Sequence, residues 1–375
     1  MDALFLTDPG FWVDPQPFAA GHFPDKIPPL AGLDGHVLFE TSGSSGAPQW
    51  LALSKQALLV SAAMVNRHLR VSEECCWGLA LPLHHVGGFG VVARAFEAAC
   101  ALQVYSWGWE AGSFQVWLGH HGVTHTSLVP AQVHDLVRAG LVAPPDLVAI
   151  VVGGGQLDER TGQAARDLGW PVLASYGMTE ACSQIATQGL DLLDSSYQPA
   201  PLPVLPIWQT RASATGHLSI AGPALFSGSL HREGEAWRFS PRIGEWHLTA
   251  DRADVTSNLL TPRGRIDALV KVLGELVDPE GIERELLGYA NGALAPGTFA
   301  VVAVPDERAG HRLVPVFEAA VDAQTTAAAL AIYQEQAPGF RRLQPPQVLA
   351  ALPRSPLGKL RRAELATALG TSAAG

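Results

Sequence analysis

A stretch rich in glycine and hydroxyl side chains runs from Thr41 to Gln49 (TSGSSGAPQ), directly after an apolar run. Glycine lets the backbone turn sharply, so successive N–H groups can point inward and bind an anion. The hydroxyl groups add donors for phosphate oxygens, and the candidate residues are Thr41, Ser42, Gly43, Ser44, Ser45 and Gly46. A helical pattern follows, but the Gly-Lys-Ser/Thr ending of a Walker A loop does not. On this pattern alone, a phosphate site and a flexible turn are both open.

Two further loops follow apolar runs and carry groups suited to a nucleotide. Gly153, Gly154 and Gly155 end the run LVAIVV and leave room for a flat ligand against bare backbone, although a plain loop is the alternative. The second loop, SYGMTE, carries an aromatic ring that can stack on a base. Its Thr and Glu offer a hydroxyl and a carboxylate, which are the oxygen ligands that Mg²⁺ prefers.

Charged residues in the last third of the chain offer two more kinds of site. Asp251 in LTAD and Asp267 in GRID each supply a carboxylate that could bind both hydroxyls of a ribose, or could lie solvated on the surface. Beyond Phe340 there are six basic residues and one acid, so this tail carries +5 in a chain of net charge −10. Its charged residues are Arg341, Arg342, Arg354, Lys359, Arg361, Arg362 and Glu364. The contrast favours a docking surface for a polyanion.

A rival signal lies at Gly88–Ala93 (GFGVVA), which fits the G-x-G-x-x-A dinucleotide fingerprint. It follows a strand-like run, and Glu110 stands about 20 residues further on, as a ribose-binding acid would. Against it, the sequence HHVG separates the strand from the glycines, where the fingerprint needs a tight turn. A nicotinamide-binding oxidoreductase is therefore the less favoured alternative.

The elements that must position these loops can be read from the apolar pattern. From His36 to about residue 200, short apolar runs alternate with helical stretches, which predicts an α/β domain with a largely parallel, doubly covered sheet. Ser54 stands where the first helix would be N-capped. After about Pro201, short aromatic runs indicate a β-rich subdomain, and past Gly264 a small α+β domain of roughly 100 residues follows. Residues 1–35 show no period and read as an irregular arm.

Composition narrows the class of protein. Of the 375 residues, 47% are hydrophobic and 16% charged, which suits a folded chain with a large core. The net charge of −10 argues against a general nucleic-acid binder. Four cysteines are too few for a disulfide scaffold, and the first residues lack the basic region of a secretory signal. Charged residues and histidines interrupt the most apolar stretch, 79–102, so no membrane insertion is expected and a cytoplasmic location is favoured.

In this order, the motifs resemble those of the adenylate-forming acyl-activating enzymes, which include acyl-CoA synthetases, peptide-synthetase adenylation domains and luciferases. The resemblance runs from His36 to Arg362. TSGSSGAPQ is similar to the phosphate loop, LPLHHVGG to the loop beside the acyl group, VGGGQ to the adenine-side glycines, and YGMTE to the adenine and metal loop. LTAD is similar to the ribose motif, GRIDALVKVLGELVDPEGIE to the interdomain hinge, and SPLGK to the catalytic-lysine loop.

The resemblance implies a role for each matching residue. For ATP and AMP it implies the hydroxyl-rich loop together with Gly153, Gly154, Gly155, Tyr176, Gly177, Met178, Thr179, Asp251 and Arg265. It implies that Thr179 and Glu180 hold the metal, that Lys359 and His85 are catalytic, that His85 and Arg94 border the acyl substrate, and that Asp267 is the hinge. The implied domains are a large AMP-binding domain, residues 1–266 and shortened at its N-terminus, and a small mobile lid domain, residues 267–375, that carries the lysine.

The implied activity is an ATP-dependent, AMP-forming acid–CoA ligase that works through an acyl-adenylate with ATP, Mg²⁺ and coenzyme A. Compact chains with LPL-x-HVGG and a downstream arginine most resemble the o-succinylbenzoate–CoA ligases of menaquinone biosynthesis. Here Arg94 stands nine residues after His85 in an otherwise apolar segment, and a buried guanidinium needs an anionic partner, such as a dicarboxylate substrate. The alternative is an arginine that lies in the solvent on a helix face. The alternatives are another aryl- or short-chain acyl-CoA synthetase and a stand-alone adenylation enzyme. The expected partners are small molecules, with a homodimer left open.

Two positions depart from the family pattern. Gln49 stands where the phosphate loop often has lysine, and Ala250 stands where the ribose motif usually has glycine. The first change removes a cation from the pyrophosphate side and leaves a non-catalytic nucleotide binder as an alternative. The second exchanges one small residue for another. The presence of Lys359 favours an active enzyme.

Overall fold

The computed structural model describes residues 2–24, 27–28, 30–42, 48–234, 236–266, 268–306, 308–354 and 360–371. The chain divides into two compact units, which are treated separately below. The first comprises residues 1–249 and 253–262, and the second residues 250–252 and 263–375. Each unit has an apolar core of its own.

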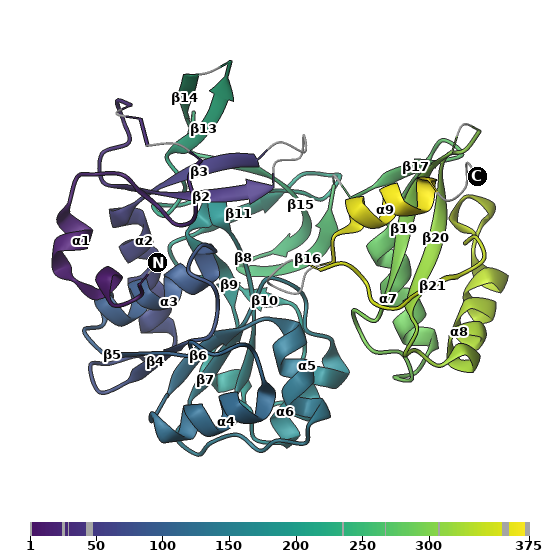
Figure 1. Cartoon of the computed structure of the whole chain (residues 1–375), viewed down its shortest axis with the longest axis horizontal. Coiled ribbons are helices and arrows are strands. Elements are labelled where there is room, and N and C mark those ends of the chain that lie inside the picture. The colour runs from purple at the N-terminus through teal and green to yellow at the C-terminus, as the bar shows by residue number, and fades with distance from the viewer. Residues whose placement is uncertain are drawn as a thin grey trace. The chain divides into compact units, whose positions relative to one another are not determined.

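A six-stranded sheet forms the centre of the first unit, in the order β5-β4-β6-β7-β8-β9 (Figure 1). Every neighbouring pair is parallel except β8 and β9, which are antiparallel. The short central strands β4, β6 and β7 are buried along their whole length, as strands covered on both faces must be. The strands are β4 (Cys76–Leu79), β5 (Ala101–Val104), β6 (His125–Leu128), β7 (Ala149–Val152), β8 (Val172–Met178) and β9 (Ser183–Thr187).

Helices cover both faces of this sheet, which confirms the predicted α/β class (Figure 1). On one face α2 (Lys55–His68) packs against α3 (Val86–Glu97). The other face carries α4 (Ala111–His120), α5 (Pro130–Arg138) and α6 (Glu159–Asp167). Among the described residues, no helix combines the length and apolar character needed to cross a membrane.

Two smaller sheets contain the strands after Pro201, which the aromatic runs predict, and one of them also contains β1, β2 and β3 from the start of the chain. One has the order β1-β2-β3-β13-β14 and the other β10-β16-β15-β12-β11. Their strands are β1 (Phe18–Ala19), β2 (His36–Ser42), β3 (Pro48–Ser54), β10 (Leu202–Pro203), β11 (Gln209–Ala212), β12 (His217–Ala221), β13 (Gly228–Glu233), β14 (Ala236–Pro241), β15 (His247–Thr256) and β16 (Leu259–Arg265). Short 3-10 helices occur at η1 (Phe5–Thr7), η2 (Thr179–Ala181) and η3 (Leu190–Leu192).

The N-terminal arm is more ordered than its sequence predicts. It contains the five-residue helix α1 (Pro9–Val13), which buries Phe11 and Trp12. Lys55 anchors the arm, because its ammonium group donates to the Asp14 carbonyl at 2.7 Å and lies 4.4 Å from the centre of the Phe11 ring. The aromatic residues that gave no periodic signal therefore serve as packing groups.

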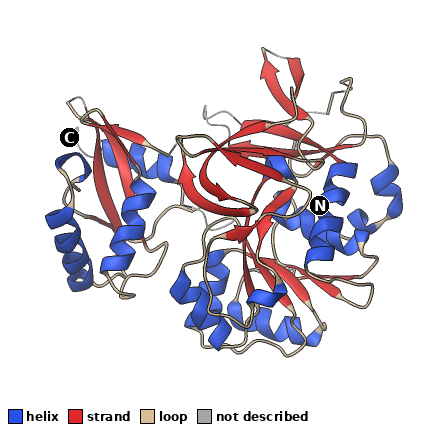
Figure 2. Ribbon diagram, turned by 180° about the vertical axis from the view of Figure 1, so that it is seen from behind, coloured by secondary structure: helices blue, strands red, loops and turns tan. Residues whose placement is uncertain are grey.

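The second unit is built on a three-stranded sheet in the order β19-β20-β21, so β19 is an edge strand. Figure 2 shows strands of this unit with helices on both sides. Odd-numbered residues of β19 pack with α7 and α8, whereas even-numbered residues pack with α9, so helices cover both faces. A hairpin of β17 and β18 precedes α7. The elements are β17 (Val270–Val272), β18 (Glu275–Val277), α7 (Pro279–Tyr289), β19 (Phe299–Asp306), β20 (Gly310–Glu318), α8 (Ala323–Gln336), η4 (Gly339–Arg341), β21 (Gln347–Leu349) and α9 (Arg362–Thr371).

The predicted N-cap of α2 is confirmed and gives a test of the fold. The Ser54 hydroxyl accepts a hydrogen bond from the Ala57 N–H at 3.0 Å. Ser54→Ala should lower the free energy of unfolding by about 1 kcal/mol because that N–H loses its acceptor. Ser54→Asn keeps an acceptor and should retain most of the stability. Urea denaturation followed by tryptophan fluorescence measures both variants, and equal losses would contradict the capping role.

Candidate functional site

The parallel strands of the first unit bring several candidate loops to one edge of the sheet. Leu128 of β6 pairs with Val152 of β7, and Val152 pairs with Ala174 of β8. On the other side of β6, β4 pairs with it in the same direction. Ligands of such sheets bind beyond the carboxyl ends of the strands. The loops that follow β4 and β7, and the end of β8, therefore share one edge.

The glycine loop follows β7 directly. The Gly153 N–H donates to the Leu128 carbonyl at 3.1 Å, so this residue still belongs to the sheet edge. Gly154 has φ of 76° and is exposed, as is Gly155. Because Val152 lies opposite Ala174, the loop begins at the same edge of the sheet as the end of β8. A Cβ atom on Gly154 would lie 3.5 Å from Val129, and one on Gly155 would lie 3.6 Å from Pro130, so the loop then runs toward the start of α5. The structure thus places both predicted nucleotide-binding segments at one edge of the sheet.

The YGMTE motif is divided between two elements. Tyr176, Gly177 and Met178 end β8, while Thr179 and Glu180 begin η2. A Cβ atom on Gly177 would lie 1.6 Å from the Ser183 carbonyl oxygen. Only glycine permits this approach of β9 to β8, so the motif glycine has a steric function independent of any ligand.

The hydroxyl and carboxylate of this motif suit a magnesium ion that is shared with phosphates. Within the described part of the chain, no group of three or more His, Cys, Asp or Glu side chains could hold a metal ion by itself. Mg²⁺ is commonly bound by one or two carboxylates together with waters and substrate phosphates. Thr179 and Glu180 fit that donor set. The described residues provide no site in which protein side chains alone would surround the ion.

The hydroxyl-rich loop lies in a different setting from the one predicted. Its flanks are β2 and β3, which pair antiparallel with Thr41 opposite Gln49. The stretch therefore connects two strands. The predicted helix does follow, with Ser54 as its N-cap, but β3 lies between the stretch and the helix and was not predicted. The Thr41 hydroxyl donates to the Gln49 carbonyl at 3.2 Å. Residues 43–47, and with them Gly43, Ser44, Ser45 and Gly46, lie outside the described residues, as does the side chain of Ser42.

The geometry around α3 contradicts the dinucleotide fingerprint. The helix begins at Val86 with His85 as its N-cap residue, so Gly88 and Gly90 lie inside the helix instead of in a strand-to-helix turn. A Cβ atom on Gly88 would lie 2.3 Å from the Pro82 carbonyl oxygen, which explains this glycine by packing. The Glu110 carboxylate accepts the Gly112 and Ser113 N–H groups and caps α4 instead of facing a ribose.

His85 lies where the loop after β4 meets α3. Its ring centre is 4.3 Å from that of His84, and the residue is partly exposed, whereas His84 is exposed. Because this loop follows β4, which pairs with β6, His85 belongs to the same sheet edge as the glycine loop. The structure thus groups His85 with the nucleotide candidates of the first unit.

Arg94 is buried in the first unit, with 2% of the residue exposed. Its guanidinium donates to the Ser127 hydroxyl at 3.2 Å and to the Ser183 hydroxyl at 3.3 Å. It also lies 5.2 Å from the centre of the Trp77 ring. Burial lowers the pKa of Arg94 to about 9, so the side chain keeps its charge at neutral pH. Among the described residues, no carboxylate forms an ion pair with it.

The neighbours of Arg94 were not predicted. Trp77 lies on β4, Ser127 on β6, and Ser183 begins β9. Ser127 lies in a strand with the sequence HTSL, where most side chains are polar, so nothing in the sequence distinguishes this serine. Ser183 gave no signal either, because its position depends on two consecutive residues with positive φ, Cys182 at 50° and Ser183 at 113°. A solvent-exposed Arg94, the alternative reading of the helix, is wrong.

In the second unit the ribose candidates lie side by side. Arg265 Nη1 is 3.4 Å from Asp251 Oδ1, and the Asp251 side chain is 16% exposed. The Ile266 N–H donates to the Ala250 carbonyl at 2.7 Å and joins the two segments. The predicted hinge Asp267 and the predicted catalytic Lys359 lie outside the described residues.

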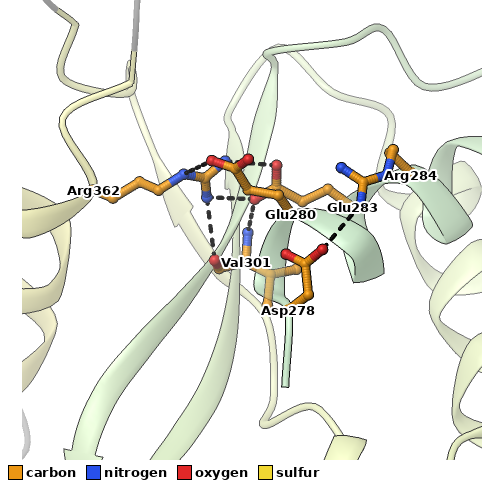
Figure 3. Close-up of polar contacts among 6 residues, drawn as sticks. All are labelled: Asp278, Glu280, Glu283, Arg284, Val301 and Arg362. Carbon is orange, nitrogen blue, oxygen red and sulfur yellow. Dashed lines mark hydrogen bonds and ion pairs between the residues drawn. The ribbon is translucent and has the colours of Figure 1, made fainter. Parts of the chain in front are cut away.

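Much of the basic charge of the tail is paired within the second unit. Four of its arginines pair with carboxylates of the same unit, namely Arg341 with Glu285, Arg354 with Glu318, Arg361 with Glu364, and Arg362 with both Glu280 and Glu283 (Figure 3). The net charge of +5 includes only the residues after Phe340, whereas most of the carboxylates that pair with these arginines lie earlier in the chain. Binding of a polyanion by the tail stays a prediction.

Comparison with solved structures supports the fold. The o-succinylbenzoate coenzyme A synthetase of Bacillus subtilis, solved with AMP, matches 88% of this chain and 68% of its own at a TM-score of 0.72 and 22% identity. ATP-bound MatB from Rhodopseudomonas palustris matches 89% of this chain and 68% of its own at a TM-score of 0.73 and 22% identity. At these identities the likeness concerns the fold.

Sequence relatives and a family model extend the comparison. The 2-succinylbenzoate–CoA ligase of Escherichia coli (strain K12) is 30% identical over 281 residues, which are 74% of this chain and 57% of the relative. That of Bacillus cereus is 28% identical over 343 residues, which are 88% of this chain and 69% of the relative. The chain thus spans less than three fifths of the E. coli relative's length. The AMP-binding enzyme model matches residues 11–229, more than half of the chain, and the chain therefore belongs to the AMP-binding enzyme family.

Proposed function

We propose that this protein joins a carboxylic acid to coenzyme A in an ATP-dependent, AMP-forming reaction, and that the acid is o-succinylbenzoate. Family membership and the 2-succinylbenzoate–CoA ligase relatives support the reaction class. The observation that carries the choice of acid is the buried Arg94, which has hydroxyl neighbours but no carboxylate partner among the described residues. A second carboxylate on the substrate is the partner that such a guanidinium lacks.

In the first half-reaction the substrate carboxylate attacks the α-phosphorus of ATP, pyrophosphate leaves, and an acyl-adenylate forms. Positioning and charge neutralisation supply most of the catalysis in such a reaction. The glycine loop and Tyr176 bind adenine, and the backbone of the hydroxyl-rich loop binds phosphate, with Gln49 in place of a cation. Thr179 and Glu180 hold Mg²⁺, which neutralises phosphate charge when bound.

Residues of the second unit complete the proposed chemistry. Asp251 accepts the ribose hydroxyls with Arg265 beside it. Lys359 neutralises charge at the α-phosphate during the first step. In the second step the thiol of coenzyme A attacks the acyl carbon and AMP leaves, with His85 bordering the acyl group. Because one lysine loop cannot serve both steps from one position, we assign Asp267 as the hinge that moves it.

The proposal extends to the cellular location, the partners and the assembly of the enzyme. All four cysteines are free, which agrees with a reducing compartment and supports the cytoplasm as its location. Its partners are the acid, ATP and coenzyme A. We propose a homodimer as the assembly, and light scattering of the purified protein tests it.

Acid-dependent exchange of pyrophosphate into ATP tests the proposed function. We expect exchange with o-succinylbenzoate to exceed exchange with benzoate and with short-chain and fatty acids. ATP with Mg²⁺ should raise the thermal midpoint, and NAD(H) should not, because the glycines of α3 lie inside a helix. Exchange with another acid alone would overturn the substrate assignment, and stabilisation by NAD(H) alone would overturn the reaction class.

Arg94→Met tests the role of the buried guanidinium. We expect kcat/KM for o-succinylbenzoate to fall at least about 30-fold, because truncating one partner of a buried charged contact typically costs about 2–5 kcal/mol. The KM for ATP should not change. An apolar side chain of similar length should fold well at this buried position, so the thermal midpoint should be retained. An unchanged KM for the acid would contradict the assignment.

Lys359→Ala separates the two half-reactions. Without the lysine, acid-dependent pyrophosphate release should fall by about 100-fold or more, as expected when a group that stabilises transition-state charge is removed. Thioester formation from supplied acyl-adenylate and coenzyme A should continue, because that step does not involve the pyrophosphate leaving group. Rapid-quench measurements of each step provide the comparison, and equal loss of both would refute the role of the lysine.

A further inference from the structure

Three of the four cysteines lie where two parallel strands of the first unit begin side by side (Figure 1). Cys75 and Cys100 directly precede β4 and β5, and Cys76 is the first residue of β4. The Ala101 N–H donates to the Cys75 carbonyl at 3.3 Å. One hydrogen bond therefore joins the backbone of Cys75 to the peptide that follows Cys100, which brings these two residues next to each other.

The strand register selects one pair among the three thiols. Cys76 lies opposite Ala101. The residues one step earlier on each chain, Cys75 and Cys100, therefore lie opposite each other. Neighbouring strands are about 4.8 Å apart, and a disulfide joins residues whose Cα atoms are about 4.4–6.8 Å apart. Successive side chains of an extended segment point to opposite faces, so Cys76 points away from this pair and is buried.

The two thiols of this pair differ in their surroundings. Both residues are partly exposed, and all four cysteines are free. The Sγ atom of Cys75 accepts the Ser72 N–H at 3.4 Å in the exposed turn before β4. Burial, with a smaller contribution from charge on Cys75 and Cys76, raises the pKa of Cys100 to about 11. Cys75 is therefore the thiol that an oxidant meets first, and Cys100 is placed to react with the oxidised product.

The same turn limits the kind of oxidant. Glu73 and Glu74 are exposed there and directly precede Cys75. Their carboxylates repel an anionic oxidant such as glutathione disulfide, whereas they exert no such repulsion on an uncharged one. Hydrogen peroxide is small and uncharged, so it suits this position.

We propose that Cys75 and Cys100 are a redox-modification site, at which hydrogen peroxide produces a reversible disulfide within the chain. The Cys75 thiolate attacks one peroxide oxygen, the O–O bond breaks, and a sulfenic acid and hydroxide form. Cys100 then attacks the Cys75 sulfur, the S–O bond breaks, and water leaves as the S–S bond forms. In total, two thiols and one peroxide give one disulfide and two waters.

The disulfide would close residues 75–100 into a covalent loop. This loop contains His85 and Arg94, but the two cysteines lie at the amino ends of the strands, whereas the candidate loops follow the carboxyl ends. Oxidation should therefore stabilise the segment without changing the edge that carries the candidate site. The thermal midpoint should rise by about 5 °C, because the link restricts the unfolded chain.

Peptide mapping of the full chain without reductant, after treatment with hydrogen peroxide, tests the pair. Trypsin cuts after Arg70 and Arg94, so Cys75 and Cys100 fall in different peptides. The unmodified protein should yield these two peptides joined by a link that dithiothreitol cleaves. Cys76 shares the first peptide, and Cys76→Ser is therefore the matched control, which should keep the link. Cys75→Ser should lose it.

A second variant follows the fate of the sulfenic acid. Without Cys100 no thiol resolves it, so in Cys100→Ser the Cys75 sulfur should proceed to the sulfinic acid, which dithiothreitol does not reduce. The unmodified protein should show little sulfinic acid at the same peroxide dose. Mass spectrometry of the tryptic peptides measures both products.

Several results would overturn the inference. These are a link that persists in Cys75→Ser, a disulfide between two chains, and sulfinic acid in the unmodified protein without any link. A link that lowers the thermal midpoint would also overturn it, because it would show that the folded chain has to be distorted to join these residues. None of these readouts depends on catalysis, so they remain decisive even if the proposed function fails its own test.

Discussion

The parallel register of β4, β6, β7 and β8 is the constraint on which the site of the first unit depends. Parallel neighbours carry their carboxyl ends to the same edge, so segments far apart in the sequence meet without any contact being specified between them. The glycine loop, Tyr176 and His85 share that edge for this reason. A change of register would separate the segments, even if each side chain kept its local conformation.

Arg94 shows how this architecture accommodates a charge. Moving a guanidinium out of water is unfavourable by several kcal/mol, and two hydroxyl groups and an aromatic face recover only part of that. A folded chain keeps such a residue where another interaction compensates, and an anionic ligand can do so. In the proposed function, the same surroundings would disfavour a neutral substrate, since it would leave the guanidinium without a counter-charge. The selectivity that we propose and the unfavourable burial would then have one origin.

The alternation of elements could be predicted from the sequence, because buried parallel strands are continuous apolar runs and helices repeat with a different period. Ser54 could be predicted as an N-cap because capping depends only on residues at the start of the helix, here Ser54 and Ala57. Contacts that depend on three-dimensional pairing were not. In the sequence, β2 and β3 look like a single strand followed by a helix, because β3 leads directly into α2. Likewise, no local pattern links Arg362 to Glu283, which lies 79 residues earlier.

The outer edge of β19 has a further consequence for how the second unit behaves in a crowded solution. An edge strand with free N–H and C=O groups is a template on which another chain can add a strand, which is a route to aggregation. The antiparallel register directs the Val301 backbone groups toward that edge, opposite a proline that has no N–H, and they bond to Glu283 and Arg362. The charged pair thus acts as a gatekeeper against intermolecular β-pairing at this residue.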